Sequence, residues 1–186
     1  GVFLLPGCPG RAETERLRTS APLLRVLCTR RHPWLADLWA AAQARGTSCF
    51  VTGSTLTACL MPATARLAPP SDLDVFVESE ALLDACLVDL RVAVAAHGGT
   101  TVVRTRSKHK YRLALSFAHD AHEMDLYAHG LCALQAYHIS AARVAFDGTR
   151  LFCAPSAVVA LATSVNVGFQ LRWKPERALA ILLRLA

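Results

Sequence analysis

The chain has 186 residues, of which 53% are hydrophobic and 18% charged, and its net charge is +6. This composition is ample for a packed core, and the length predicts one domain or one domain with a small helical appendage. No apolar run reaches the length of a membrane span, and the opening residues lack the basic start of a signal peptide. The seven cysteines form no C-x-x-C pair, which predicts free thiols in a reducing, intracellular compartment.

Hydrophobic periodicity, prolines and glycines predict the elements in chain order. We expect a mobile N-terminal arm over residues 1–19, a core over 20–154 and a helical C-terminal segment over 155–186 packed on that core. Within the core, the patterns predict helices over 22–30, 33–45, 55–61 and 80–97, and strands over 49–52, 72–77, 101–106, 110–117 and 122–128. This order predicts an α/β (α+β) fold with a mixed β-sheet and helices packed on one side.

The expected strand over 72–77 opens with two carboxylates, Asp72 and Asp74. Alternate side chains of a strand leave from the same face, so these two point together while Leu73 and Val75 point into a core. Carboxylates that share a face repel each other unless a cation lies between them, and anionic oxygen ligands suit Mg²⁺. The pair therefore indicates a site for Mg²⁺ and for phosphates that arrive with it.

A glycine-serine turn, Gly53 and Ser54, joins the expected strand over 49–52 to a helix. Glycine lets backbone N–H groups approach a phosphate closely, and the N-terminus of a helix favours an anion. We expect these two residues to hold phosphates beside the metal.

A third carboxylate is available on the expected strand over 122–128, where polar and apolar residues alternate. Glu123 and Asp125 share one face of that strand, and Met124 and Leu126 share the other. We expect this strand to complete the site.

The order Gly53-Ser54, Asp72, Asp74 and Asp125 resembles the polymerase-beta-like nucleotidyltransferase superfamily. Its pattern is a Gly-Ser helix turn, an Asp-x-Asp strand and a later Asp on a neighbouring strand. The chain looks most similar to the small nucleotidyltransferase-like proteins of large DNA viruses and some eukaryotes. The resemblance implies a minimal nucleotidyltransferase fold, with the protein in the cytoplasm or nucleus of a host cell if it is viral.

The resemblance also implies a reaction, in which a nucleoside monophosphate passes from a nucleoside triphosphate such as ATP to an acceptor hydroxyl. Asp72, Asp74 and Asp125 would be the catalytic residues and the ligands of Mg²⁺ or Mn²⁺. Gly53 and Ser54 would hold the outer phosphates. The acceptor stays open between RNA, a protein side chain and a small molecule. The alternative is a catalytically silent module that binds nucleotide or nucleic acid.

Two basic residues, Arg172 and Lys174, precede Pro175, which is placed to start a terminal helix. Cations at this end of a helix are unfavourable unless an anion lies nearby. In the superfamily, a basic side chain from the helical part often reaches the triphosphate. We expect Lys174 to contact the β- or γ-phosphate with Arg172 nearby, and a solvated helix start is the open alternative.

A run of cations at alternate positions comprises Arg104, Arg106, Lys108, Lys110 and Arg112. On one continuous strand all of them would share a face and form a basic stripe suited to a nucleic-acid backbone. A hairpin turn near residue 107 would split the stripe into two clusters. A solvated outer face of the sheet is the other interpretation.

Two other metal sites are poorly supported. A calcium loop that starts at Asp72 would need glycine and glutamate where Val77 and Leu83 stand. A zinc site would use His119, His122, His129 and Cys132. An expected strand separates these residues, and alternation sends the two inner histidines to opposite faces. No glycine-lysine-serine or glycine-lysine-threonine loop is present.

Overall fold

The computed structural model describes residues 15–17, 19–60, 72–137 and 139–163. Its α-helices are α2 (Ala21–Arg31), α3 (Leu35–Ala44), α4 (Gly53–Leu60), α5 (Leu83–Ala96) and α6 (Pro155–Thr163). Its strands are β1 (Cys49–Thr52), β2 (Asp72–Val77), β3 (Thr100–Ser107), β4 (Lys110–Ser116), β5 (Ala121–Ala128), β6 (Val144–Phe146) and β7 (Leu151–Cys153). Short 3₁₀ helices are η1 (Glu80–Leu82), η2 (Gly130–Ala136) and η3 (Ser140–Ala142).

The strands form a single seven-stranded sheet in the order β3-β4-β5-β2-β1-β6-β7. Strands β2 and β5 are parallel, and every other neighbouring pair is antiparallel. The parallel pair places two strands that are distant in sequence side by side at the centre of the sheet. The expected mixed sheet flanked by helices is confirmed.

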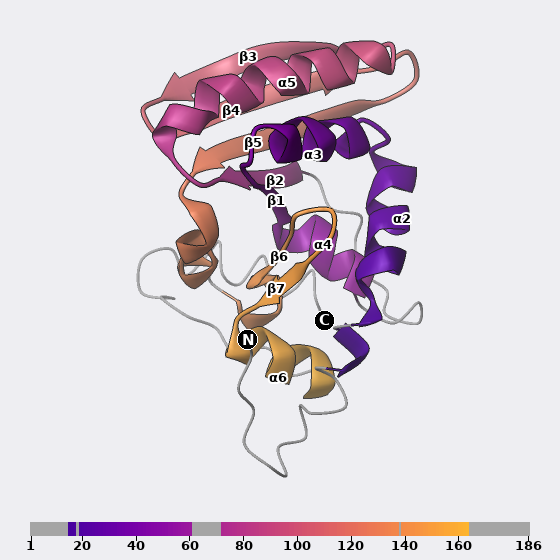
Figure 1. The fold of residues 1–186 in the computed structure, drawn as a ribbon, viewed down its shortest axis with the longest axis vertical. Coiled ribbons are helices and arrows are strands. Elements are labelled where there is room, and N and C mark those ends of the chain that lie inside the picture. The colour runs from indigo at the N-terminus through magenta and orange to yellow at the C-terminus, as the bar shows by residue number, and fades with distance from the viewer. Residues whose placement is uncertain (1–14, 18, 61–71, 138, 164–186) are drawn as a thin grey trace.

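One face of the sheet, called here the core face, carries the main hydrophobic core. Helices α3 and α5 lie side by side across it, as Figure 1 shows near the top of the molecule. The alternating apolar residues of β2 and β5 point into this layer: Leu73, Val75, Met124 and Leu126 are at most 2% exposed. Their burial on one face sends the alternate polar residues to the other, which is called the carboxylate face.

The carboxylate face has a smaller apolar cluster of its own. Phe50 of β1 and Phe76 of β2 pack there with Leu134 of η2 and Ala145 of β6. This cluster covers one end of the face and leaves the β2–β5–β4 region beside it for polar side chains.

The main helices and strands occur where they were expected, with ends that differ by up to three residues. Strands β6 and β7 were not predicted, because strands of three residues are too short to show alternation. The described residues of the expected arm, 15–17 and 19, are helical, and Leu17 is buried in the core. Among the described helices, none is long and apolar enough to cross a membrane.

Candidate active site

The register of the central strands brings the predicted carboxylates together. Asp74 of β2 lies directly opposite Asp125 of β5. The same row continues to Thr52 of β1 on one side and to Arg112 of β4 on the other. In the next row, Asp72 lies opposite Glu123. Two separate stretches of sequence therefore meet in one patch of negative charge.

Burial and repulsion both act on Asp74. Burial, and then the neighbouring charge of Asp72, raise the pKa of Asp74 to about 6, against a hydrogen bond from Tyr137 that lowers it. Since a carboxylate with a raised pKa is held in an environment that disfavours its charge, added positive charge here would be stabilising.

Gly53 closes the site from the side of helix α4. Its φ is +72°, a left-handed conformation that favours glycine, and a Cβ atom there would lie 2.6 Å from Asp74 Oδ2 and 3.2 Å from the Tyr137 hydroxyl. Glycine therefore lets the start of α4 lie against the carboxylate. Ser54 follows in the first turn of the helix and is exposed.

Tyr137 holds the same carboxylate oxygen of Asp74 with a hydrogen bond. Its hydroxyl donates to Asp74 Oδ2 at 3.2 Å and shares a hydrogen bond with Thr52 Oγ1 at 2.5 Å. Arg143 is 7% exposed and donates from Nε and Nη2 to the Tyr137 carbonyl oxygen at 3.2 and 3.1 Å. Burial beside Asp74 raises the pKa of Tyr137 well above its usual value, so the hydroxyl stays protonated and available as a donor.

Lys110 reaches the carboxylate patch from strand β4. Its Nζ donates to Asp125 Oδ2 at 2.6 Å and to the Tyr127 hydroxyl at 3.0 Å. The Tyr127 hydroxyl also donates to Asp125 Oδ2 at 3.0 Å. Burial and the nearby carboxylates raise the pKa of Tyr127, which keeps this hydroxyl protonated as well.

The donor set fits a divalent cation in part. Asp125 Oδ1 is buried and has no hydrogen-bond partner among the described residues, while Arg112 Nε lies 3.9 Å from it. Buried oxygens without a hydrogen-bond donor are rare, and a bound ion is one way to satisfy such an atom. However, no three histidine, cysteine, aspartate or glutamate side chains of the described ranges come together as a ready metal cluster. The patch offers two neighbouring carboxylates, Asp74 and Asp125, with Lys110 on one of them.

The basic stripe is not one continuous strand. Strands β3 and β4 form a hairpin whose turn lies at Lys108 and His109, and the register shifts between Val103 and Thr105. Lys110 and Arg112 point to the carboxylate face, whereas Arg106 lies over the Tyr111 ring and within 3.5 Å of Asp84 on α5. The hairpin alternative is therefore correct, because the turn reverses the chain in the middle of the run.

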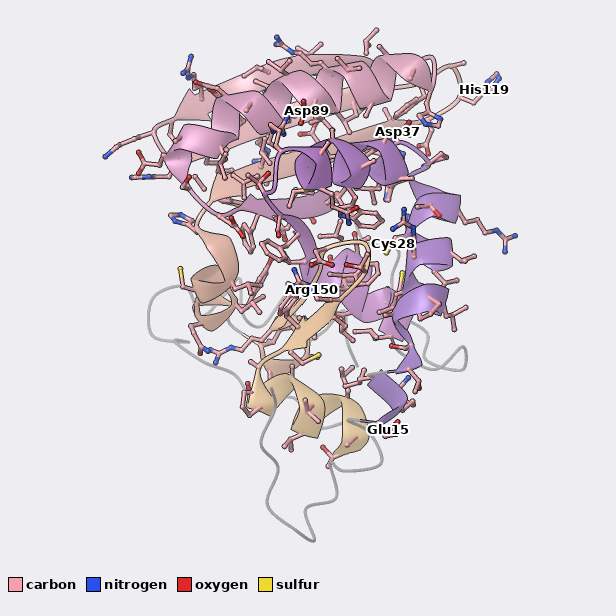
Figure 2. All side chains as sticks on the ribbon, in the orientation of Figure 1. Glu15, Cys28, Asp37, Asp89, His119 and Arg150 are labelled. Atoms are coloured by element: carbon pink, nitrogen blue, oxygen red, sulfur yellow. The ribbon has the colours of Figure 1, made fainter. Side chains whose placement is uncertain are left out.

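The histidines and the cysteine considered for zinc do not come together as one group in the described part of the chain. Figure 2 shows His119 at a corner of the molecule, in the connection between β4 and β5. His122 contacts Asp120 and the His32 ring at one end of β5, and His129 stacks on His109 beyond its other end. The two cations expected near the phosphates, Arg172 and Lys174, lie outside the described residues.

Two tyrosines of the site were not predicted. Tyr127 continues the alternation of Glu123 and Asp125 on one strand face, so the sequence did contain a signal for it. Tyr137 stands just after a 3₁₀ helix, far from any strand with an alternating pattern. Only the packing of η2 on the carboxylate face shows its role.

The fold is shared with known tRNA-processing enzymes. No protein-family model and no curated protein match the sequence. A structure of the CCA-adding enzyme of Thermotoga maritima complexed with tRNA has a TM-score of 0.58 and 14% identity, and the match covers 88% of this chain and 36% of that one. A structure of a CCA-adding enzyme with ATP gives 0.60 and 16%, over 88% of this chain and 40% of that one.

A third structure, of a tRNA-processing enzyme in an apo form, has a TM-score of 0.57 and 14% identity over 81% of this chain and 41% of that one. The chain thus spans less than half the length of each of these proteins. At these identities the likeness concerns the fold alone, and the described part of this chain has the fold of a segment of the CCA-adding enzymes.

Proposed function

We propose that the chain is a metal-dependent nucleotidyltransferase, which moves a nucleoside monophosphate from a nucleoside triphosphate to an acceptor hydroxyl. The observation that carries this proposal is the register that sets Asp74 beside Asp125, with Asp72 two residues away, at the centre of the sheet. Membership of the polymerase-beta-like superfamily belongs to the same proposal, and likeness to viral members stays a prediction.

Each residue of the patch has a role in this proposal. Asp74 and Asp125 would hold the cation from neighbouring strands, with Asp72 beside them. When bound, Mg²⁺ supplies charge neutralisation for the triphosphate and activation of the acceptor hydroxyl. Gly53 keeps backbone N–H groups near the carboxylates, where phosphates would lie, and Ser54 offers an exposed hydroxyl in the same turn. Tyr137 fixes the orientation of the Asp74 carboxylate.

Binding of Mg²⁺ and ATP is the first expected result. At a ligand concentration of 100 times the Kd, binding stabilises a protein by about 2.7 kcal/mol. For a domain of this size that corresponds to a rise in Tm of roughly 5–10 °C. Differential scanning fluorimetry measures it, with ATP plus EDTA and Mg²⁺ alone as controls. A shift that is the same without the metal would contradict the proposed site.

The chemistry is tested with labelled ATP in a cell extract that supplies acceptors. Nucleotidyl transfer incorporates label from the α-phosphate, whereas a phosphoryl transfer would incorporate label from the γ-phosphate. Retention of α-label in RNA, in protein or in a small molecule also identifies the acceptor class. An extract in which only γ-label is retained would contradict the proposed reaction.

RNA is one proposed acceptor, supported by the structure of a CCA-adding enzyme complexed with tRNA. Arg112 is half exposed on the carboxylate face, whereas Arg106 faces α5, so the two arginines of one hairpin form a matched pair. If an RNA strand reaches the site, Arg112→Gln should reduce the slope of log affinity against log salt by about 0.7, the value for one single-strand phosphate contact. Arg106→Gln should leave that slope unchanged. Fluorescence anisotropy with a single-stranded oligonucleotide measures the salt slope of each variant. Equal reductions in the two variants would show that only the total charge of the protein matters, and would contradict a direct phosphate contact by Arg112.

A catalytically silent binding module is the second candidate, and one observation favours it. Lys110 Nζ already forms an ion pair with Asp125, whereas a carboxylate that binds a metal would need to be free of such a partner. A module of this kind would show the Tm shift with nucleotide but would incorporate no α-label into any acceptor.

A further inference from the structure

Lys110 is held in the carboxylate patch by more than one contact. Its Nζ lies 2.6 Å from Asp125 Oδ2, 3.0 Å from the Tyr127 hydroxyl and 4.6 Å from the centre of the Tyr127 ring. The side chain of Asp125 is 11% exposed and that of Lys110 is 31% exposed. A short charge-assisted hydrogen bond to a mostly buried carboxylate is among the stronger interactions of a protein surface.

The ammonium group lies among several carboxylates. Asp125 stands next to Asp74 in the parallel register, and Asp72 and Glu123 form the adjoining row. Asp125 Oδ2 accepts hydrogen bonds from Lys110 Nζ and from the Tyr127 hydroxyl. Asp125 Oδ1 is buried and has no hydrogen-bond partner among the described residues. Lys110 thus neutralises one oxygen of this carboxylate, and Arg112 Nε lies 3.9 Å from the other oxygen.

We propose that Lys110 is a built-in counter-ion of Asp125, which competes with a divalent metal for this carboxylate. The inference rests on the metal site of the proposed function. A lysine ammonium is a compact point charge on a flexible stem, and the partial exposure of this side chain gives it a path into solvent. The free protein therefore stabilises its own carboxylate patch, and the bound metal takes over that role.

Lys108 provides the matched control. It stands two residues away at the turn of the same hairpin, its side chain is 75% exposed, and its partner is Glu80 at 3.6 Å rather than a carboxylate of the patch. Replacing either lysine with methionine removes one positive charge and keeps most of the aliphatic stem. The two variants therefore have the same net charge and differ in whether Asp125 loses its contact with the lysine ammonium group.

The experiment is a titration with Mn²⁺ in the absence of nucleotide, followed by electron paramagnetic resonance. Removing a competing charge-assisted hydrogen bond should tighten binding, so we expect Lys110→Met to lower the Kd for Mn²⁺ by about tenfold or more. Lys108→Met should bind like the wild type. In an Asp125→Asn background, Lys110→Met should bring no such gain, because the contested carboxylate is gone.

A second readout is the stability of the metal-free protein. Lys110→Met removes the shorter of the two ion pairs that Asp125 forms among the described residues and leaves Arg112 Nε at 3.9 Å, so its Tm without metal should fall. Mn²⁺ should then raise the Tm of this variant by more than it raises the Tm of the wild type. If Lys110→Met does not fold, Lys110→Gln removes the same charge and gives the same comparison. Unchanged or weaker Mn²⁺ binding, or no Mn²⁺ binding in either variant, would overturn the inference.

These results separate the inference from the proposed function. Tighter Mn²⁺ binding by Lys110→Met in a protein that transfers no nucleotide would support the counter-ion and reject the transferase. Transfer by the wild type with no change in Mn²⁺ affinity would support the transferase and reject the counter-ion.

Discussion

Replacing Asp74 with asparagine should stabilise the metal-free protein and abolish its response to Mg²⁺ and ATP. The charged form of Asp74 is disfavoured in the native state, because burial and Asp72 raise its pKa to about 6 from 3.8. This difference corresponds to at most about 3 kcal/mol at neutral pH. We expect Asp74→Asn to recover about 1–3 kcal/mol of unfolding free energy at pH 7, measured by urea denaturation.

The pH dependence of this gain has a definite sign. Between pH 6 and pH 3.8 the native state binds a proton at Asp74 more strongly than the unfolded state does, so acidification stabilises the wild type through this group. The gain in unfolding free energy from Asp74→Asn should therefore be largest above about pH 6 and should vanish toward pH 3.8. An advantage that is constant with pH would show that the carboxylate of Asp74 is not the cause.

Asp74→Asn should lower activity although it raises the stability of the metal-free protein. A metal ligand supplies several kcal/mol of transition-state stabilisation, so Asp74→Asn should lower nucleotidyl transfer by roughly 10³-fold and remove the Tm shift with Mg²⁺ and ATP. Asp37→Asn is the control, because Asp37 is 56% exposed and pairs with His97 away from the patch. An Asp74→Asn protein that keeps the full shift would exclude Asp74 as a ligand.

Replacing Gly53 with alanine should weaken nucleotide binding as well as lower stability. A residue other than glycine at φ +72° is strained by about 1–3 kcal/mol, and the new Cβ would also lie 2.6 Å from Asp74 Oδ2. That contact must displace the carboxylate or the start of α4. We expect the affinity for Mg²⁺ and ATP to fall by on the order of tenfold or more, about 1.4 kcal/mol, measured by isothermal titration calorimetry.

Gly98 offers a matched control for this change. Its φ is +73°, but a Cβ atom there would meet nothing within 4 Å. Gly98→Ala should therefore lose similar stability through backbone strain and keep its affinity for ATP. A valine at position 53 sharpens the test, since it should weaken binding of ATP far more than binding of adenosine if the glycine lies against phosphates. Equal losses for ATP and adenosine, or equal losses in Gly53→Ala and Gly98→Ala, would indicate general destabilisation instead.

The carboxylate strands could be read from the sequence because both alternate with period two. Asp72 and Asp74 share a face for the same reason that Leu73 and Val75 are buried, and Glu123 and Asp125 follow the same rule. Alternation is local, so it fixes the direction of each side chain without reference to the rest of the chain. The mixed sheet also followed from the order of helices and strands.

Only the tertiary structure decided which side chains meet. The parallel register of β2 and β5 sets Asp74 against Asp125, and no local pattern fixes a register between strands so far apart in the chain. The β3–β4 turn splits the basic run and turns Lys110 toward Asp125, although the sequence alone left both arrangements open. Tyr137 reaches Asp74 through the packing of a short 3₁₀ helix, which carries no periodic signal. The sequence thus determined which carboxylates and cations are available for the site, and long-range packing determined which of these side chains are in contact.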